Sequence, residues 1–140
     1  PEQSNPSGRV ITSTTMSSYE TGTWTPTVSA THGGFSGTVT IHNANYTKIG
    51  STVWVNAFLS VGVTAVGTGG AQIEGLPFTV SGGPVPFKAV HGDLAASNGG
   101  YFIDGEEIMY FVQDQVTGPA PISGTGNKSI MISGHYHTDE

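Results

Sequence analysis

Two histidines near the end of the chain are spaced for metal binding. His135 and His137 stand in the segment GHYHTDE, and side chains two positions apart in a β-strand point to the same side. Because neutral imidazole is a common metal ligand, the pair could supply two ligands to one ion. The alternative is a solvated terminal strand, because the alternate residues that precede the pair are two serines and a methionine.

Carboxylates in the second half of the chain could supply acid–base chemistry. Glycoside hydrolysis uses two of them, about 5–10 Å apart. The candidates are Asp93, Asp104, Glu106, Glu107 and Asp114. Their spacing singles out no acid–base pair, since Glu106 and Glu107 are adjacent and should point to opposite faces. A serine–histidine–aspartate triad stays open, although a G-x-S-x-G motif is absent, so no catalytic residue is predicted.

Aromatic side chains offer a third kind of chemistry, which is stacking against a sugar ring. Tyr101 and Tyr110 flank a turn at Asp104, and Trp54 is a second possible platform. Sugar-binding sites combine an aromatic face with groups that hydrogen-bond to hydroxyls. The predicted ligand-binding residues are therefore Trp54, Tyr101, Asp104 and Tyr110, and the alternative is that these aromatic residues pack in the core.

The composition argues against several classes of function. Of 140 residues, 10% are charged, and four Lys and Arg residues stand against ten Asp and Glu residues. A net charge of −6 without clustered cations does not suit a phosphate backbone, so no nucleic-acid partner is expected. The chain has no cysteine for disulfides or thiolate sites. No apolar run approaches the ~20 residues of a membrane-spanning helix, so membrane insertion is not expected.

The elements that would position these residues are strands. Segments with period-two alternation, separated by glycine-rich turns, predict about eight or nine strands and no helix. They cover residues 24–30, 37–43, 44–50, 51–63, 69–80, 86–94, 99–104, 107–116 and 128–138. The predicted strands at 99–104 and 107–116 form a hairpin with Asp104-Gly105 as its tight turn. This spacing favours an all-β fold, an antiparallel β-sandwich or a jelly-roll-like barrel.

The strand at 51–63 carries apolar residues on both sides. One side is uniformly apolar, from Val53 to Val63. The other side holds Trp54 and Phe58 at positions where a half-exposed strand would be polar. Another sheet edge, a neighbouring subunit or a ligand is therefore expected to cover these two aromatic residues.

Three blocks of the sequence resemble a known family. They are YETGTWTPTV (19–28), YTKIGSTVWVNAFLSV (46–61) and IEGLPFTVSG (73–82). In this order and spacing they resemble the C-terminal domains of tail fibres and tailspikes of tailed bacteriophages. The blocks span Tyr19 to about Val80, and the second half of the chain is similar in style alone.

The resemblance implies a β-sandwich-like domain that assembles as a homotrimer at the host-facing tip of the virion. Residues 1–17 would be a linker or extended lead-in from an upstream domain, and residues 18–140 would be the domain itself. Its partners would be copies of itself and a host cell-surface polysaccharide or receptor, bound without turnover. Some family members bind an axial iron through His-x-His, which would make His135 and His137 ligands in a trimer; no other cofactor is expected.

Two alternatives stay open beside this hypothesis. A glycan-degrading enzyme domain would have a deep pocket with convergent carboxylates. A trimerisation or folding cap would have a large subunit interface and no ligand.

Overall fold

The computed structural model of the chain describes residues 19–90, 92–95, 97–113 and 118–140. These residues form nine β-strands and no helix, which confirms the predicted all-β class. The lead-in predicted for residues 1–17 lies outside the described residues, as does the candidate carboxylate Asp114.

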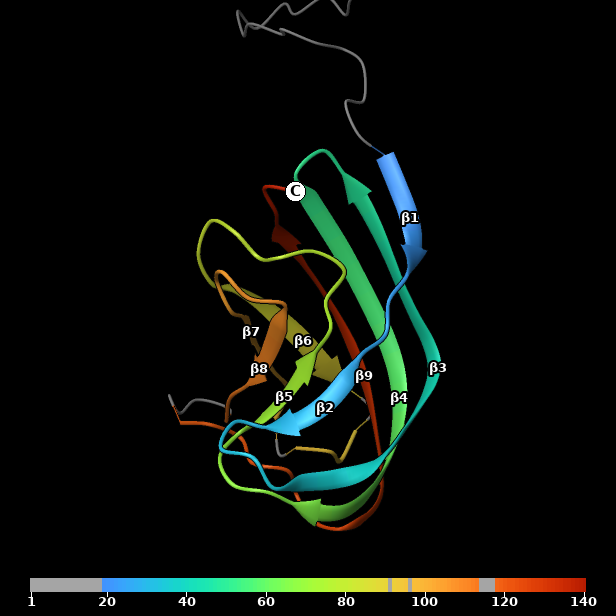
Figure 1. The fold of residues 1–140 in the computed structure, drawn as a ribbon, viewed down its shortest axis with the longest axis vertical. Coiled ribbons are helices and arrows are strands. Elements are labelled where there is room, and N and C mark those ends of the chain that lie inside the picture. Colours follow the sequence, from blue (N-terminus) through green and yellow to red (C-terminus); the bar gives the residue numbers. More distant parts are fainter. Residues whose placement is uncertain (1–18, 91, 96, 114–117) are drawn as a thin grey trace, which may run out of the picture.

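All nine strands join one antiparallel sheet (Figure 1). The strand order across the sheet is β1-β3-β4-β9-β6-β7-β8-β5-β2. The strands are β1 Tyr19–Thr23, β2 Thr27–Ala30, β3 Phe35–Ile49, β4 Thr52–Val66, β5 Ala71–Glu74, β6 Val85–Val90, β7 Gly99–Phe102, β8 Ile108–Phe111 and β9 Gly126–His137. Three strands, β3, β4 and β9, are 12 to 15 residues long, and the others are much shorter.

The sheet curls over itself, so that short strands face long strands. In Figure 1, β2, β5 and β8 lie across from β4 and β9, with one apolar core between them. The largest fully buried side chains of this core include Tyr136, Phe102, Phe111, Leu59 and Ile73. Burial of these apolar surfaces is the main force that holds the two parts of the sheet together.

Alternation along β4 matches the two predicted sides of this strand. The inward residues Val53, Val55, Ala57, Leu59, Val61 and Val63 are at most 3% exposed. On the outward side Trp54 is 45% exposed and Phe58 is half-buried. The described chain therefore leaves nearly half of Trp54 exposed.

Residues 35–49 form one strand, where the sequence pattern predicts two. His42 is the extra residue of a β-bulge, because Ile41 pairs with Leu59 and Asn43 pairs with Phe58. A bulge bends its strand and increases the local twist, in keeping with the curl of the sheet. The break in alternation at His42 is the reason that one bent strand reads as two.

The first described segment crosses from one edge of the sheet to the other. β1 pairs with β3, and β2 pairs with β5. Trp24 and Pro26 lie in the crossing, so the prediction of a strand that begins at Trp24 is wrong. The indole of Trp24 is 6% exposed, and its Nε1 donates to the carbonyl of Asn56 at 3.3 Å. Trp24 therefore fastens the crossing to β4.

The three blocks that carry the family resemblance meet beside this crossing. The Tyr46 hydroxyl donates to the Glu20 carboxylate at 2.5 Å, which raises the pKa of Tyr46. The Tyr46 ring packs edge-on against Phe78, with 5.4 Å between ring centroids. Lys48 is buried, with its Nζ 5.6 Å from the centroid of the Phe78 ring. A Cβ at Gly22 would lie 2.7 Å from the Tyr46 ring. These contacts are structural, and they join β1, β3 and the segment after β5.

The predicted hairpin of β7 and β8 is present, with shorter strands and a longer connection. Residues 103–107 join the two strands, and the Ile103 N–H donates to the Ile108 carbonyl at 3.0 Å. Gly105 has a φ of 80°, a conformation that favours glycine. The Glu106 N–H also donates to the Ile103 carbonyl at 3.2 Å, so the tight turn predicted at Asp104-Gly105 is present within this connection.

Candidate binding surfaces

The outward side chains of β3, β4, β9 and β6 form a continuous exposed surface, named here the long-strand face. The antiparallel register aligns them in rows, which are Thr47–Trp54–His135, Asn45–Asn56–Ser133–Lys88 and Asn43–Phe58–Met131–Val90. Among the described outward residues of these four strands, Lys88 is the single Lys, Arg, Asp or Glu. The long-strand face is therefore almost free of formal charge.

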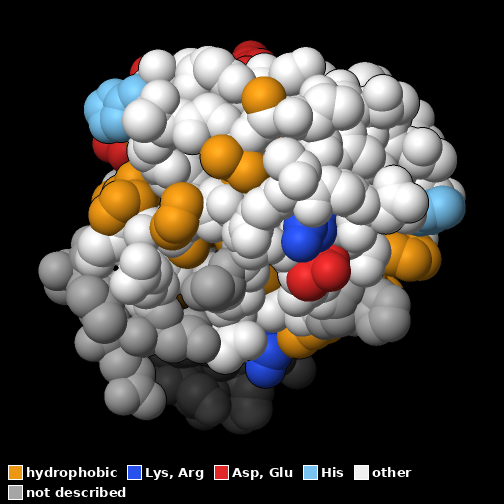
Figure 2. Space-filling view, turned by 90° about the horizontal axis from the view of Figure 1, so that it is seen from below, with side chains coloured by type: hydrophobic (Ala, Val, Ile, Leu, Met, Phe, Trp, Pro, Cys, Tyr) orange, Lys and Arg blue, Asp and Glu red, His pale blue; other side chains and the backbone are white. Residues whose placement is uncertain are grey.

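The long-strand face exposes three large apolar side chains, and two of them, Val90 and Met131, line a hollow. Trp54, Val90 and Met131 are 45%, 49% and 39% exposed. A hollow of about 530 Å³ lies among the residues Asn43, Asn56, Ala57, Phe58, Lys88, Val90, Met131, Ile132 and Ser133. Figure 2 shows that charged side chains are also sparse on the end of the molecule seen from below, where hydrophobic side chains form small groups.

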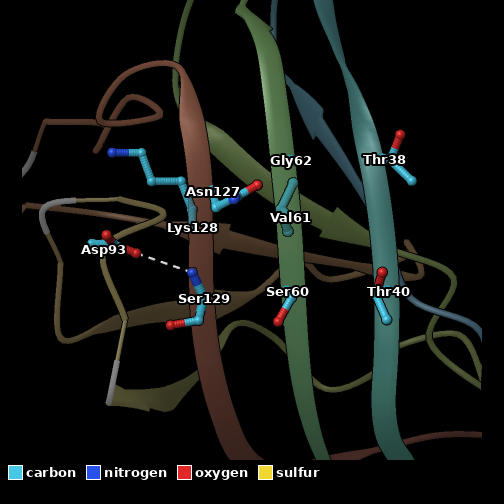
Figure 3. A pocket seen from close by; sticks show the side chains of 9 residues that line it. All are labelled: Thr38, Thr40, Ser60, Val61, Gly62, Asp93, Asn127, Lys128 and Ser129. Atoms are coloured by element: carbon cyan, nitrogen blue, oxygen red, sulfur yellow. Dashed lines mark hydrogen bonds between the residues drawn. The ribbon is translucent and has the colours of Figure 1, made fainter.

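A second hollow, of about 600 Å³, continues the long-strand face toward the far ends of β3, β4 and β9 (Figure 3). Hydroxyl and amide groups line it, from Thr38, Thr40, Ser60, Asn127 and Ser129, and the charged residues Lys128 and Asp93 lie beside them. At its rim Asp93 is held by the backbone, since its Oδ1 accepts from the Ser129 N–H at 3.0 Å. No aromatic ring lines this hollow, so it offers hydrogen bonds without a stacking platform.

His135 and His137 both point outward from β9 and are exposed. His135 pairs across strands with Trp54, and the two ring centroids are 6.2 Å apart. Within the described residues, no group of three or more His, Cys, Asp or Glu side chains could hold a metal ion.

The outward side chains of β7, β8, β5 and β2 form a second surface, named here the short-strand face. Tyr101 and Tyr110 are directly opposite each other on β7 and β8, with ring centroids 5.6 Å apart. Phe102 and Phe111, the aromatic neighbours of this pair, are fully buried. Partial burial, and then the nearby Tyr101, raise the pKa of Tyr110, so its hydroxyl stays protonated at neutral pH.

The structure places the four predicted ligand-binding residues in three different parts of the molecule. Tyr101 and Tyr110 are together, but Trp54 lies on the long-strand face, with β9 and β6 between it and β7. Asp104 lies in the β7–β8 connection, where its Oδ1 accepts from the Gly83 N–H at 3.1 Å. The Asp104 carboxylate therefore links the β7–β8 connection to the segment between β5 and β6.

Three carboxylates of the described residues meet at one hollow. Glu106 and Glu107 precede β8, outside strand alternation, and both line a hollow of about 280 Å³ together with Glu74. The prediction that they point to opposite faces assumed a strand at these positions. Thr79 Oγ1 donates to Glu107 at 3.3 Å, and no serine or histidine lines this hollow.

The sequence reasoning missed several residues of these two faces. Val90 and Met131 become neighbours of Phe58 through strand pairing alone. The pairing of β5 with β8 places Gln72 opposite Tyr110 and Glu74 opposite Ile108. Alternation marked each of them as outward, but nothing in the sequence showed which strands pair.

Comparison of the chain with protein-family models, with curated proteins and with solved structures found no match. The described residues contain no helix long and apolar enough to cross a membrane.

Proposed function

We propose that this chain is the non-catalytic C-terminal domain of a phage tail fibre or tailspike, which trimerises and attaches the virion to the host-cell surface. The three sequence blocks of the resemblance suggest this family. In this proposal the curled sheet is a β-sandwich or jelly-roll-like version of the fold of that family. The virion tip would be its location, and a polysaccharide or receptor would be its target.

The observation that carries the proposal is the long-strand face. It exposes Trp54, Val90 and Met131 among uncharged polar residues. Protein interfaces are enriched in aromatic residues and methionine and poor in charge at their centres. A surface with little charge can meet a copy of itself without like-charge repulsion, so we assign this face to the contacts between subunits.

A trimer would also give His135 and His137 a role. Three copies of β9 near a three-fold axis would bring three histidine pairs together, and imidazole nitrogens suit a transition metal. The metal is proposed for the trimer, because the described residues of one chain contain no group of three or more metal-binding side chains.

The proposal is tested by the solution mass of the protein, measured by light scattering after size exclusion. One chain has a mass of 14.4 kDa, so a trimer has about 43 kDa. Met131→Lys should shift the mass to that of one chain, because a lysine at the centre of the interface would be buried without a partner. The matched control is Thr27→Lys on the exposed outer side of β2, which should stay trimeric.

A wild-type protein with the mass of one chain would overturn the trimer and the assignment of the long-strand face. A trimer that survives Met131→Lys would keep the assembly but place its interface elsewhere. Loss of the trimer in a chelator would identify His135 and His137 as ligands of a shared metal.

A further inference from the structure

The short-strand face has a row of side chains that four strands bring together. The register aligns Tyr101, Tyr110, Gln72 and Ser29 across β7, β8, β5 and β2. Glu74 lies on the same side of β5 as Gln72, two positions along the strand. The result is a pair of aromatic rings beside an amide, a hydroxyl and a carboxylate.

The Glu74 carboxylate is held in place by its neighbours. Ser29 Oγ donates to Glu74 Oε1 at 3.1 Å, and Gln72 Nε2 donates to the same oxygen at 2.8 Å. Within the described part of the chain, Oε2 receives no hydrogen bond from these two donors. Glu74 is half-buried. Because two hydrogen bonds already hold its Oε1, its Oε2 can accept a hydrogen bond from a ligand with little further loss of side-chain freedom.

This combination matches the chemistry of a sugar. The C–H face of a pyranose ring stacks on an aromatic ring, and its hydroxyls need acceptors and donors at fixed positions. Tyr101 is 37% exposed, so its ring can be reached from solvent. Glu74 also lines a hollow of about 280 Å³ that it shares with the β7–β8 connection.

The negative charge of the short-strand face favours neutral sugars over acidic ones. None of the four strands carries a lysine or arginine, and Glu106 and Glu107 line the hollow next to Glu74. Acidic sugars would meet like charge and find no cation here.

We propose that the short-strand face binds a neutral saccharide, with Tyr101 and Tyr110 stacking on a sugar ring and Glu74 accepting hydrogen bonds from its hydroxyls. The inference rests on the proposed attachment function and names the ligand class and the site. It places the saccharide on a different face from the subunit contacts, so each chain of an assembly carries its own site. Weak sites repeated in several copies would act together through multivalency.

The test is calorimetric titration of the full chain with neutral hexasaccharides of glucose, galactose and mannose. A hexagalacturonate and a chitosan hexamer serve as the acidic and cationic probes. At least one neutral probe should bind and shift the aromatic NMR signals of Tyr101 and Tyr110. Tyr101→Ala should weaken binding roughly tenfold, the size of a lost stacking contact.

Glu74→Gln is the second variant, because it keeps the size of the side chain and removes the charge of the acceptor. It should weaken binding about fivefold, the difference between a hydrogen bond to a charged acceptor and one to a neutral acceptor. Tyr19→Ala is the matched control, since Tyr19 is 63% exposed on β1, outside the short-strand face, and it should bind like the wild type.

The site is overturned if no neutral probe binds, if binding is confined to the charged probes, or if both variants bind as tightly as the wild type. These outcomes are separate from the failure of the proposed function. A monomeric wild type that binds a neutral probe through Tyr101 would overturn the trimer and leave this site in place. A trimer that binds no neutral probe would overturn the saccharide site and leave the trimer in place.

Discussion

The two outer faces of this one sheet differ in how their polar and apolar groups are arranged. The long-strand face spreads Trp54, Met131 and Val90 over three strands, among polar side chains and around shallow hollows. The short-strand face gathers two tyrosines beside a carboxylate that Ser29 and Gln72 hold in place. Spread apolar area suits another protein surface, whereas a fixed carboxylate beside aromatic rings suits a small polar ligand.

The difference follows from strand length and from what each strand pairs with. β4 and β9 pair over twelve residue pairs, so their outward side chains form long rows with room for a broad contact. β5 and β8 pair over three residue pairs, so their outward side chains form a compact cluster. One sheet can therefore present two kinds of surface.

The largest effect is expected from adding a methyl group to a glycine beneath the short-strand face. A Cβ at Gly100 would lie 1.8 Å from the carbonyl oxygen of Tyr110. This oxygen belongs to the backbone of β8, so Gly100→Ala must separate β7 from β8. We expect the free energy of unfolding to fall by about 3 kcal/mol or more, as measured by urea denaturation.

Gly62→Ala is the matched change on the long-strand face. The nearest atom to a Cβ at Gly62 is Oδ1 of Asn127, at 3.7 Å. This is an ordinary contact, so the cost should stay below about 1 kcal/mol. Equal losses in the two variants would contradict the close packing of β7 on β8.

A smaller effect is expected where the core ties β9 to the segment after β5. Tyr136 is fully buried, and its hydroxyl donates to the Phe78 carbonyl at 2.9 Å and accepts from the Phe78 N–H at 3.3 Å. Tyr136→Phe leaves these two backbone groups without that partner, so it should cost about 1–3 kcal/mol in urea denaturation. Tyr19→Phe, a change at an exposed tyrosine, should cost nothing measurable.

The pH dependence of stability sharpens this prediction. Burial is the main cause that raises the pKa of Tyr136 above its usual value, and the charges of Glu107 and Glu140 add to it. The folded protein therefore holds this proton more tightly than the unfolded chain, whose tyrosines titrate near pH ~10. Stability should fall as the pH rises above about 10, and it should fall less steeply in Tyr136→Phe. Equal slopes in the two proteins would contradict the burial of the hydroxyl.

The smallest effect compares one serine on each face. Ser29→Ala removes a donor from the Glu74 carboxylate, which should cost about 0.5–1 kcal/mol and weaken saccharide binding, because the carboxylate is then less firmly held. Ser60→Ala removes the exposed contact of its hydroxyl with His42 Nε2 at 2.7 Å. It should leave both stability and saccharide binding close to those of the wild type. Weaker saccharide binding in Ser60→Ala would contradict the assignment of saccharide binding to the short-strand face alone.

Much of the fold could be predicted because strand alternation is local. The two sides of β4 follow from the order of its residues, and the structure bears them out from Val53 to Val63. The prediction is wrong at Trp24, where the chain crosses between two edges of the sheet. The crossing depends on Trp24 reaching the carbonyl of Asn56, a contact between distant parts of the chain.

The candidate sites were predictable only in part, for the same reason. Tyr101 and Tyr110 are close because one hairpin joins them, and a hairpin is visible in the sequence. Asp104 was predicted to join them at a ligand site, but its carboxylate binds the Gly83 backbone. Strand pairing brings His135 beside Trp54, although the two residues are 81 positions apart in the sequence, and no local pattern predicts this.

The order of residues along the chain predicts most of the strands, their inward and outward sides and the low charge, because each of these depends on a residue and its near neighbours. It did not predict β1, Tyr19–Thr23. The tertiary structure alone decided which outward residues share a face. Pairing of β5 with β8 placed Gln72 beside Tyr110, and pairing of β4 with β9 placed Phe58 beside Met131. Strand pairing is set by the fit of the whole core, since backbone hydrogen bonds are alike in every pair of strands and carry no information about partners.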